Sequence, residues 1–259
     1  MKNPRIINLV SFWVAVVLLG VLAGCSYTYY ENIKCPSYVV CYVKMDSIKL
    51  RPESSDSQCI LINHGNSLPI VTYALRSTGD EKARYDYLCI KHNDLSYNQY
   101  QLLQCNPDDD SSAITYNDCD FTEITVTANK DFDEAHPAGE NLADIVRFMS
   151  WSPYRYILSG YSEYYNYNKS DVSEAFDAMM HLYKNKYLDS EFDGTCYPVD
   201  KLIKDLAAED MILNGYNAPG LIGMLYFEKK PSAQGEYSVT VKIKTDDGRV
   251  LTDTVNMQF

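Results

Sequence analysis

Acidic side chains are the most numerous groups in this sequence that could carry chemistry, and two of their clusters have suggestive spacing. Asp108–Asp110 are consecutive, and Asp131, Asp133 and Glu134 form a second group. Carboxylates bind Ca²⁺, and a facing pair can serve as the acid and base of a glycosidase. The first cluster lacks the spacing and closing Glu of an EF-hand, so we expect a solvated loop there and a local turn at the second. The prediction is therefore no metal site, no cofactor and no catalytic residue in either.

The other groups that could act as ligands or nucleophiles are dispersed. The histidines form no His-Glu-x-x-His or other metal pair, and there is no nucleophile elbow, phosphate loop or dinucleotide fingerprint. With 35 acidic residues in 259, neighbouring carboxylates carry little information. We therefore expect surface or structural roles for His64, His92, His136 and His181.

The cysteines are eight in number and form no Cys-x-x-Cys, so neither a zinc ribbon nor a thioredoxin-like site is supported. Cys105 and Cys119 bracket a polar, acidic segment. A disulfide closing a loop of this length would contribute about 3 kcal/mol in the chain-entropy model. We predict this Cys105–Cys119 bridge, with two unpaired loop thiols as the alternative.

Cys25 has the most specific surroundings of any residue. A short basic start with Lys2 and Arg5 precedes an apolar run from Leu9 to Ala23, which is short for a stable membrane span and typical of a secretory signal. The run ends in Leu22-Ala23-Gly24-Cys25, which resembles the lipobox of bacterial lipoproteins. The alternatives are an ordinary secretory signal with an accidental Cys and a transmembrane helix.

This resemblance implies a processing route. Residues 1–24 would be a signal peptide, Cys25 would receive diacylglycerol, and its new N-terminus would be acylated, for example with palmitate. Several acyl chains give stable anchoring. Ser26 stands where a retention signal often places Asp, so in a Gram-negative cell the resemblance favours the outer membrane, with its periplasmic or surface face left open.

Composition limits the class of partner. Removing residues 1–24 removes two basic residues and no acidic one, which changes the net charge from −12 to −14. Such a surface argues against nucleic acid, whose phosphates need Lys and Arg. The remaining length suits a short anchor lead, residues 25–37, and one β-rich domain, residues 38–259.

Alternating apolar residues predict strands near both ends of that domain. Residues 38–50 have the pattern of a long strand with a bend at Asp46-Ser47, and further strands are predicted at 59–62, 71–75, 85–90, 121–127 and 221–227. Helices are predicted at 142–149, 171–187 and 200–208. We therefore expect a mainly β, α+β chain: an immunoglobulin-like sandwich with a helical insert around residues 140–210.

The C-terminal hairpin allows a test of register. A loop of residues 246–248 would place Ile243 opposite Leu251 and Tyr237 opposite Met257, with Gly248 in the left-handed region. A two-residue Asp-Gly turn would instead place Ile243 opposite a polar residue. Matched apolar faces favour the longer loop.

Tyrosine is unusually frequent, with 23 residues against 8 Phe. It is concentrated in residues 151–167, whose spacing fits neither a strand nor one helical stripe. Flat aromatic rings can stack on sugars and lose little rotamer entropy on binding. Packing of Trp151 and about half of these tyrosines onto the sandwich core is the favoured interpretation, and the alternative hypothesis is a ligand-binding surface for a glycan or a protein. Its members would be Trp151, Tyr161, Tyr164, Tyr165 and Tyr167.

Several features together resemble one group of proteins. They are the lipobox, Asp131-Phe132-Asp133, His136-Pro137-Ala138-Gly139 and the ending Tyr-Ser-Val-Thr-Val…Asp-Gly-Arg-Val-Leu. They are similar to uncharacterised lipoproteins of the Bacteroidota, which implies a location in the cell envelope and no particular activity. We expect a membrane-anchored envelope lipoprotein with a binding or scaffolding role. The alternative is an envelope hydrolase that acts on glycans through paired carboxylates.

Overall fold

The computed structural model describes residues 30–53, 57–65, 71–73, 80–104, 115–166, 168–178, 194–215 and 220–259. The chain divides into two units, Met1–Ile33 with Gln101–Ser112, and Lys34–Tyr100 with Ala113–Phe259. A two-stranded sheet is formed by β1 (Tyr30–Cys35) and β6 (Gln99–Gln104). The larger unit holds the remaining sheets.

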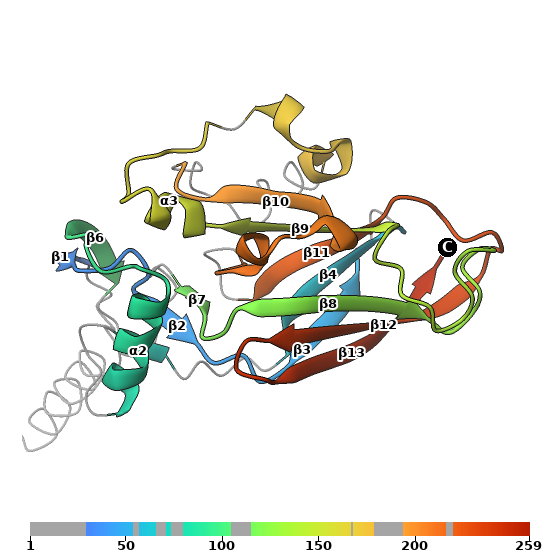
Figure 1. The fold of residues 1–259 in the computed structure, drawn as a ribbon, viewed down its shortest axis with the longest axis horizontal. Coiled ribbons are helices and arrows are strands. Elements are labelled where there is room, and N and C mark those ends of the chain that lie inside the picture. The colour runs from blue at the N-terminus through green and yellow to red at the C-terminus, as the bar shows by residue number, and fades with distance from the viewer. Residues whose placement is uncertain are drawn as a thin grey trace, which may run out of the picture. The chain divides into compact units, whose positions relative to one another are not determined.

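Two antiparallel sheets of the larger unit share one core (Figure 1). The first has the order β10-β9-β11-β4-β3, and the second has the order β13-β12-β8. Strand β12 follows the period-two pattern of a half-buried strand, since every second residue is buried: Tyr237, Val239, Val241 and Ile243. The bounds of these strands are β3 Ile48–Pro52, β4 Cys59–His64, β8 Phe121–Ala128, β9 Val146–Ser152, β10 Tyr197–Leu202, β11 Leu221–Phe227, β12 Glu236–Thr245 and β13 Val250–Gln258.

One end of this core is closed by the loop between β8 and β9. Phe132 lies in that loop, fully buried, with its ring 5.5 Å from the ring of Phe227 and 5.7 Å from that of Phe259. The same loop covers the edge of β8, because the Leu142 N–H donates to the Val126 carbonyl and the Gly139 N–H to that of Ala128. These hydrogen bonds pair backbone carbonyl groups on the edge of β8 without a further strand.

Two insertions interrupt the succession of the sheet strands. The one between β4 and β8 contains β5 (Val71–Tyr73), α2 (Asp80–Lys91) and β7 (Thr115–Asn117), and β5 and β7 flank β2 (Cys41–Val43). The one between β9 and β11 contains α3 (Tyr154–Leu158), β10 and the 3₁₀ helices η1 (Lys169–Asp171), η2 (Ile203–Asp205) and η3 (Ala208–Met211).

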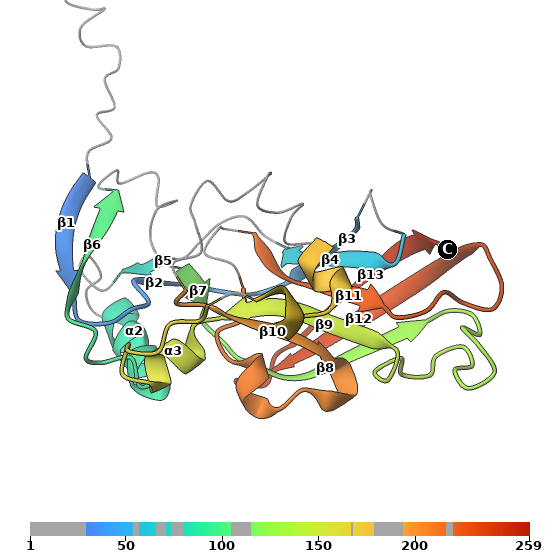
Figure 2. The same cartoon turned by 90° about the horizontal axis from the view of Figure 1, so that it is seen from above.

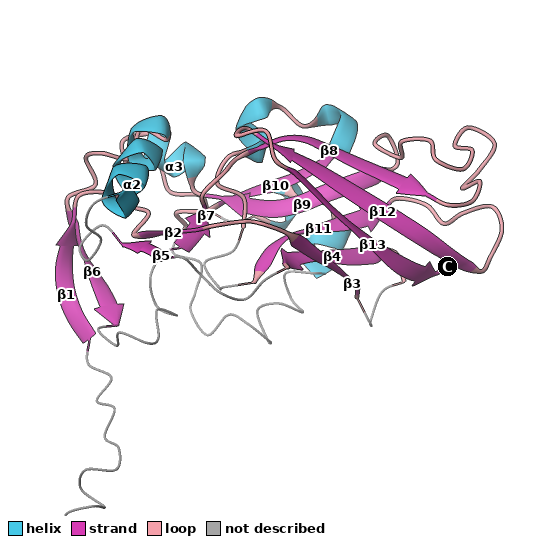
Figure 3. Cartoon of the chain, turned by 90° about the horizontal axis from the view of Figure 1, so that it is seen from below, coloured by secondary structure: helices cyan, strands magenta, loops and turns pink. Residues whose placement is uncertain are grey.

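Both insertions contribute to a second, tyrosine-rich core. Figures 2 and 3 show α2 and α3 at the same end of the sheets, away from the C-terminus. Aromatic rings from both insertions are buried against one another, and hydrogen bonds satisfy several of their hydroxyl groups. The two insertions therefore pack together. The buried members include Tyr38, Tyr42, Tyr85, Leu88, Tyr116, Tyr156, Tyr161 and Leu213.

The mainly β class with helical insertions is confirmed, and so is the C-terminal hairpin. Ile243 pairs with Leu251 and Tyr237 with Met257, as predicted. Gly248 has φ +86°, the left-handed conformation that a non-glycine residue adopts at a cost. The strands predicted at 59–62, 121–127 and 221–227 are β4, β8 and β11.

Other element predictions are wrong. The single long strand predicted at 38–50 is two shorter strands, β2 and β3, which belong to different sheets and lie on either side of the bend at Asp46-Ser47. The strand predicted at 85–90 lies in α2, and the second half of the helix predicted at 142–149 lies in strand β9, whose two faces are both buried. Of the helix predicted at 200–208, residues 200–202 belong to β10, residues 203–205 form the 3₁₀ helix η2, and residue 208 begins η3. Only part of the helix predicted at 171–187 is described, and there residues 174–178 are helical.

Candidate functional site

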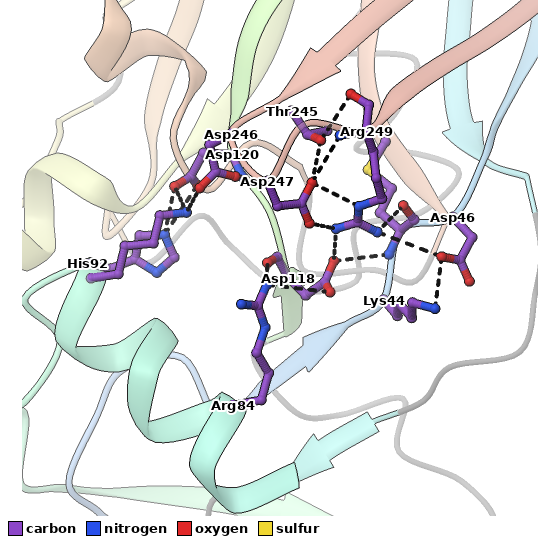
Figure 4. Close-up of polar contacts among 12 residues, drawn as sticks. Lys44, Asp46, Arg84, His92, Asp118, Asp120, Thr245, Asp246, Asp247 and Arg249 are labelled. Carbon is purple, nitrogen blue, oxygen red and sulfur yellow. Dashed lines mark hydrogen bonds and ion pairs between the residues drawn. The ribbon is translucent and has the colours of Figure 1, made fainter. Parts of the chain in front are cut away.

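Asp118 and Asp120, just before β8, lie in a cluster of charged side chains that come from several elements (Figure 4). The Arg249 guanidinium donates to Asp118 Oδ1 at 3.0 Å and to the Met45 carbonyl at 2.6 Å, and lies 2.5 Å from Asp247 Oδ2. Arg84 of α2 donates to the Asp118 carbonyl at 2.8 Å. The turn between β12 and β13 is thus fastened to α2 and to the link between β2 and β3.

Asp120 anchors a second, adjacent group. Its Oδ2 lies 2.5 Å from Lys91 Nζ and 3.0 Å from His92 Nε2, both at the end of α2. Its Oδ1 accepts the backbone N–H of Leu213, in the other insertion, at 3.1 Å. Lys91 also lies 2.6 Å from Asp246 in the hairpin turn. One carboxylate therefore joins both insertions to the sheets.

The series Tyr42, His92 and Asp120 has the residue types of a proton relay. The Tyr42 hydroxyl lies 3.1 Å from His92 Nδ1. Tyr42 and His92 are 0% and 1% exposed, so no substrate reaches either. Burial alone would raise the pKa of Asp120, but the hydrogen bonds from His92 and Lys91 outweigh it and lower the pKa. The arrangement suits a structural brace and not acid–base turnover.

Asp94 is a third buried carboxylate, and it fastens the N-terminal part of the larger unit. It accepts the N–H groups of Tyr38 at 2.6 Å and Val39 at 2.8 Å, and the hydroxyl of Tyr161 at 2.8 Å. Burial raises the pKa of Asp94. A raised pKa is what a general acid needs, but Asp94 is 0% exposed and surrounded by the chain's own donors. It holds Tyr161 at φ +62° and secures the α3 loop.

Asp133, from the acidic cluster at 131–134, and Asp144 form a clamp around His136. The imidazole lies between two carboxylates, with Nδ1 2.7 Å from Asp133 and Nε2 2.8 Å from Asp144. Burial alone would lower the pKa of His136, but these two carboxylates raise it. Lys229, at 2.5 Å, and His136 hold the pKa of Asp133 below its usual range. Asp131 and Asp133 also accept backbone N–H groups of Ala138 and Ala135, which is the local turn expected from the sequence.

The predicted aromatic surface is not assembled as expected. Trp151 and Tyr161 are only 4% and 8% exposed: Trp151 packs 5.0 Å from the ring of Phe176, and the hydroxyl of Tyr161 is bonded to Asp94. Tyr165 is half-buried, and Tyr164 is 53% exposed. Tyr167 lies outside the described residues. The exposed surface is therefore a wrong prediction for Trp151 and Tyr161.

The predicted Cys105–Cys119 disulfide is also wrong. Cys119 carries a free thiol, 2% exposed, in the core between the two sheets. That burial raises the pKa of the Cys119 thiol, which makes it unreactive. Cys105 lies outside the described residues, as do Cys25, Asp108–Asp110 and His181.

The residues that join the insertions to the sheets, which we call the brace, were not predicted from the sequence. They are Arg84, Lys91, His92, Asp118, Asp120, Asp246, Asp247 and Arg249. The signal that could have found them is Lys91-His92 at the end of α2, together with the polar turn Asp246-Asp247-Gly248-Arg249. Because residues 85–90 were predicted to be a strand, Lys91-His92 was not recognised as the end of a helix. Within the described ranges, no group of His, Cys, Asp and Glu is arranged to hold a metal ion, and no helix is long and apolar enough to cross a membrane.

Comparison with known proteins adds no family or fold. No protein-family model matches the sequence, and no curated protein or solved structure matches the chain.

Proposed function

We propose that this chain is a lipid-anchored protein of the cell envelope that carries a non-catalytic binding or scaffolding module. The Leu22-Ala23-Gly24-Cys25 sequence supports the anchor, since it directly follows an apolar signal segment. Acyl chains on Cys25 would hold the module at a membrane, and Ser26 favours the outer membrane.

One observation carries the non-catalytic part of the proposal. Each carboxylate that is buried in the described part of the chain is occupied by the chain's own donors: Asp120 by Lys91 and His92, Asp94 by backbone N–H groups, and Asp177 by Lys169. The half-buried Asp118 is held by Arg249. Glycoside hydrolysis needs two carboxyl groups that both face a substrate. No contact among the described residues favours the alternative of a glycan hydrolase.

We also infer that the two-sheet body is immunoglobulin-like. In chain order, β3, β4, β8, β9, β11, β12 and β13 would be strands A to G. The observed orders β3-β4-β11-β9 and β8-β12-β13 then correspond to the ABED and CFG sheets of that fold, with β10 added at one edge. Such sandwiches serve widely as binding modules, which is an argument by analogy from fold.

The anchor is tested by fractionation. In a Gram-negative host, the wild-type chain should take up a palmitate analogue and sediment with membranes, whereas Cys25→Ser should do neither. Ser26→Asp is the matched control: it should keep the lipid but move the protein from the outer to the inner membrane. Labelling of Cys25→Ser would overturn the assignment.

The ligand class is tested on the mature chain carrying Cys25→Ser. We expect this chain to bind a glycan on an array, or to be cross-linked to an envelope protein when it is added to isolated membranes. We expect it to release no reducing ends from envelope polysaccharides. Release of reducing ends that disappears on a carboxylate-to-amide substitution would establish the hydrolase instead.

A further inference from the structure

Helix α2 has an apolar stripe on each of two opposite sides. The inner stripe, Tyr85, Leu88 and Cys89, is buried in the tyrosine-rich core. Ala83, Tyr87 and Ile90 repeat the same helical spacing on the outer side, where Tyr87 is 53% and Ile90 is 64% exposed. A helix that is merely solvated is polar on its outer face. The outer stripe of α2, which comprises Ala83, Tyr87 and Ile90, is therefore an exposed apolar face.

The other large exposed apolar side chains of the described residues lie at the same end of the unit. Leu95 lies four residues beyond α2, Tyr100 is at the start of β6, and Leu158 and Tyr164 belong to α3 and the loop after it. Val250 follows the hairpin turn that Arg249 fastens to Met45. In the part of the chain that the structure describes, the end closed by Phe132 carries no large exposed apolar side chain. This asymmetry distinguishes the outer stripe from the scattered apolar residues of an ordinary surface.

The N-terminal part of the chain joins the unit beside α2. The Tyr97 N–H donates to the Pro36 carbonyl at 2.9 Å, and Ser37 is hydrogen-bonded to the Tyr85 hydroxyl on α2. Asp94, three residues beyond α2, accepts the N–H groups of residues 38 and 39. The stretch from Cys25 to Pro36 spans at most about 40 Å even when fully extended. An anchor at Cys25 would thus hold the α2 end close to the bilayer.

We propose that the outer stripe of α2, with Leu95, docks on the interfacial region of the membrane that carries the anchor. This inference rests on the lipid-anchored function proposed above. A tyrosine with an apolar ring and a polar hydroxyl suits the headgroup level of a bilayer. The Arg84 guanidinium lies 5.2 Å from the centroid of the Tyr87 ring, and the exposed Lys82 can extend its ammonium toward water.

The charge of the protein decides which kind of lipid contact this is. The mature chain, with its net charge of −14, is repelled by anionic headgroups, so apolar side chains and not charge attraction hold the contact, and added salt does not weaken it. Docking orients the module: the α2 end faces the bilayer, and the β8–β9 loop with Phe132 faces away from it.

Photo-cross-linking tests the docking independently of lipidation. The mature chain carries a hexahistidine tag in place of residues 1–25 and is tethered to phosphatidylcholine vesicles that contain some nickel-chelating lipid. p-Benzoylphenylalanine replaces Tyr87 in one variant and Gln258 in the matched control, since Gln258 is exposed at the other end of β13. Both variants are first checked for an unchanged melting temperature.

Lipid adducts should form several-fold more at position 87 than at position 258, should persist in high salt, and should fall when Ile90→Ser is added. Equal adducts at the two positions would overturn the proposal. Protein–protein adducts as the main product at position 87 would also overturn it, and would identify a second copy as the occupant. Failure of the anchor itself is read separately, from the fractionation of Cys25→Ser, because the tag replaces the lipid here.

Discussion

Asp120→Asn tests the brace at the junction of the insertions and the sheets. The carboxylate accepts from Lys91 at 2.5 Å, His92 at 3.0 Å and the Leu213 N–H at 3.1 Å. An asparagine keeps the shape but replaces one oxygen with an NH₂ group, which must face at least one of these donors. It also removes the negative charge beside Lys91, whose side chain is only 22% exposed.

The expected loss of stability in Asp120→Asn depends on the ion pair that Lys91 keeps in the variant. Removing one partner of a buried ion pair typically costs 3–5 kcal/mol, and Lys91 keeps Asp246 at 2.6 Å, so we expect a loss near the lower limit, about 3 kcal/mol. For a domain of this size that corresponds to a fall of roughly 6–12 °C in melting temperature. Because the pKa of Asp120 is lowered in the fold, its contribution is present above the unfolded Asp pKa of about 3.9 and is lost as pH falls through the lower folded value.

Urea denaturation followed by circular dichroism, at pH 7 and then at falling pH, measures this loss. The matched control is Glu123→Gln, which makes the same carboxylate-to-amide change in a surface pair with Lys244 where both side chains are about half exposed. Glu123→Gln should leave the midpoint nearly unchanged. If Asp120→Asn were as harmless as Glu123→Gln, or if its effect did not shrink in acid, the reasoning about the brace would be refuted.

Three further predictions concern single positions. The raised pKa of His136 means that its clamp stabilises the fold fully below the unfolded His pKa, about 6.5, and that this contribution is lost as pH rises through the higher folded pKa. The stability gap between wild type and His136→Gln should therefore narrow at alkaline pH, and a constant gap in urea titrations would contradict this. Gly248→Ala should cost about 1–2 kcal/mol, because φ is +86° there and an L-residue is strained in that region, whereas Gly248→Asn should cost less; equal losses in thermal melts would count against the assigned turn. Tyr161→Ala should cost about 3 kcal/mol or more as a buried aromatic truncation, while Tyr164→Ala, 53% exposed, should leave the melting temperature nearly unchanged; the reverse order would place the wrong ring in the core.

Local patterns in the sequence predicted the strands whose residues show a clear apolar pattern of their own. The β12–β13 hairpin followed from matching Ile243 with Leu251 around Gly248, because period-two alternation and turn length together determine register. The β8 strand followed from the same alternation around Ile124 and Val126.

The remaining elements depended on distant contacts. Helix α2 has apolar residues on two sides, so its pattern contains no clean helical stripe and resembles a strand. Strand β9 is buried on both faces, and a short apolar run without alternation fits helix and strand equally well. The brace could not be predicted from local sequence, because Asp120 contacts Lys91, Leu213 and Asp246 only once the insertions have folded onto the sheets. Likewise, the burial of Tyr161 depends on Asp94, a residue 67 positions away.

The mass of the mature N-terminal peptide tests the central proposal most directly. The chain is expressed in a Gram-negative host and purified from the membrane fraction, and its N-terminal peptide is measured by mass spectrometry. We predict that the peptide begins at Cys25 and carries diacylglycerol and an amide-linked acyl chain, and that Cys25→Ser is recovered unlipidated in the soluble fraction. A wild-type peptide that begins elsewhere, or that begins at Cys25 without lipid, would contradict the proposal.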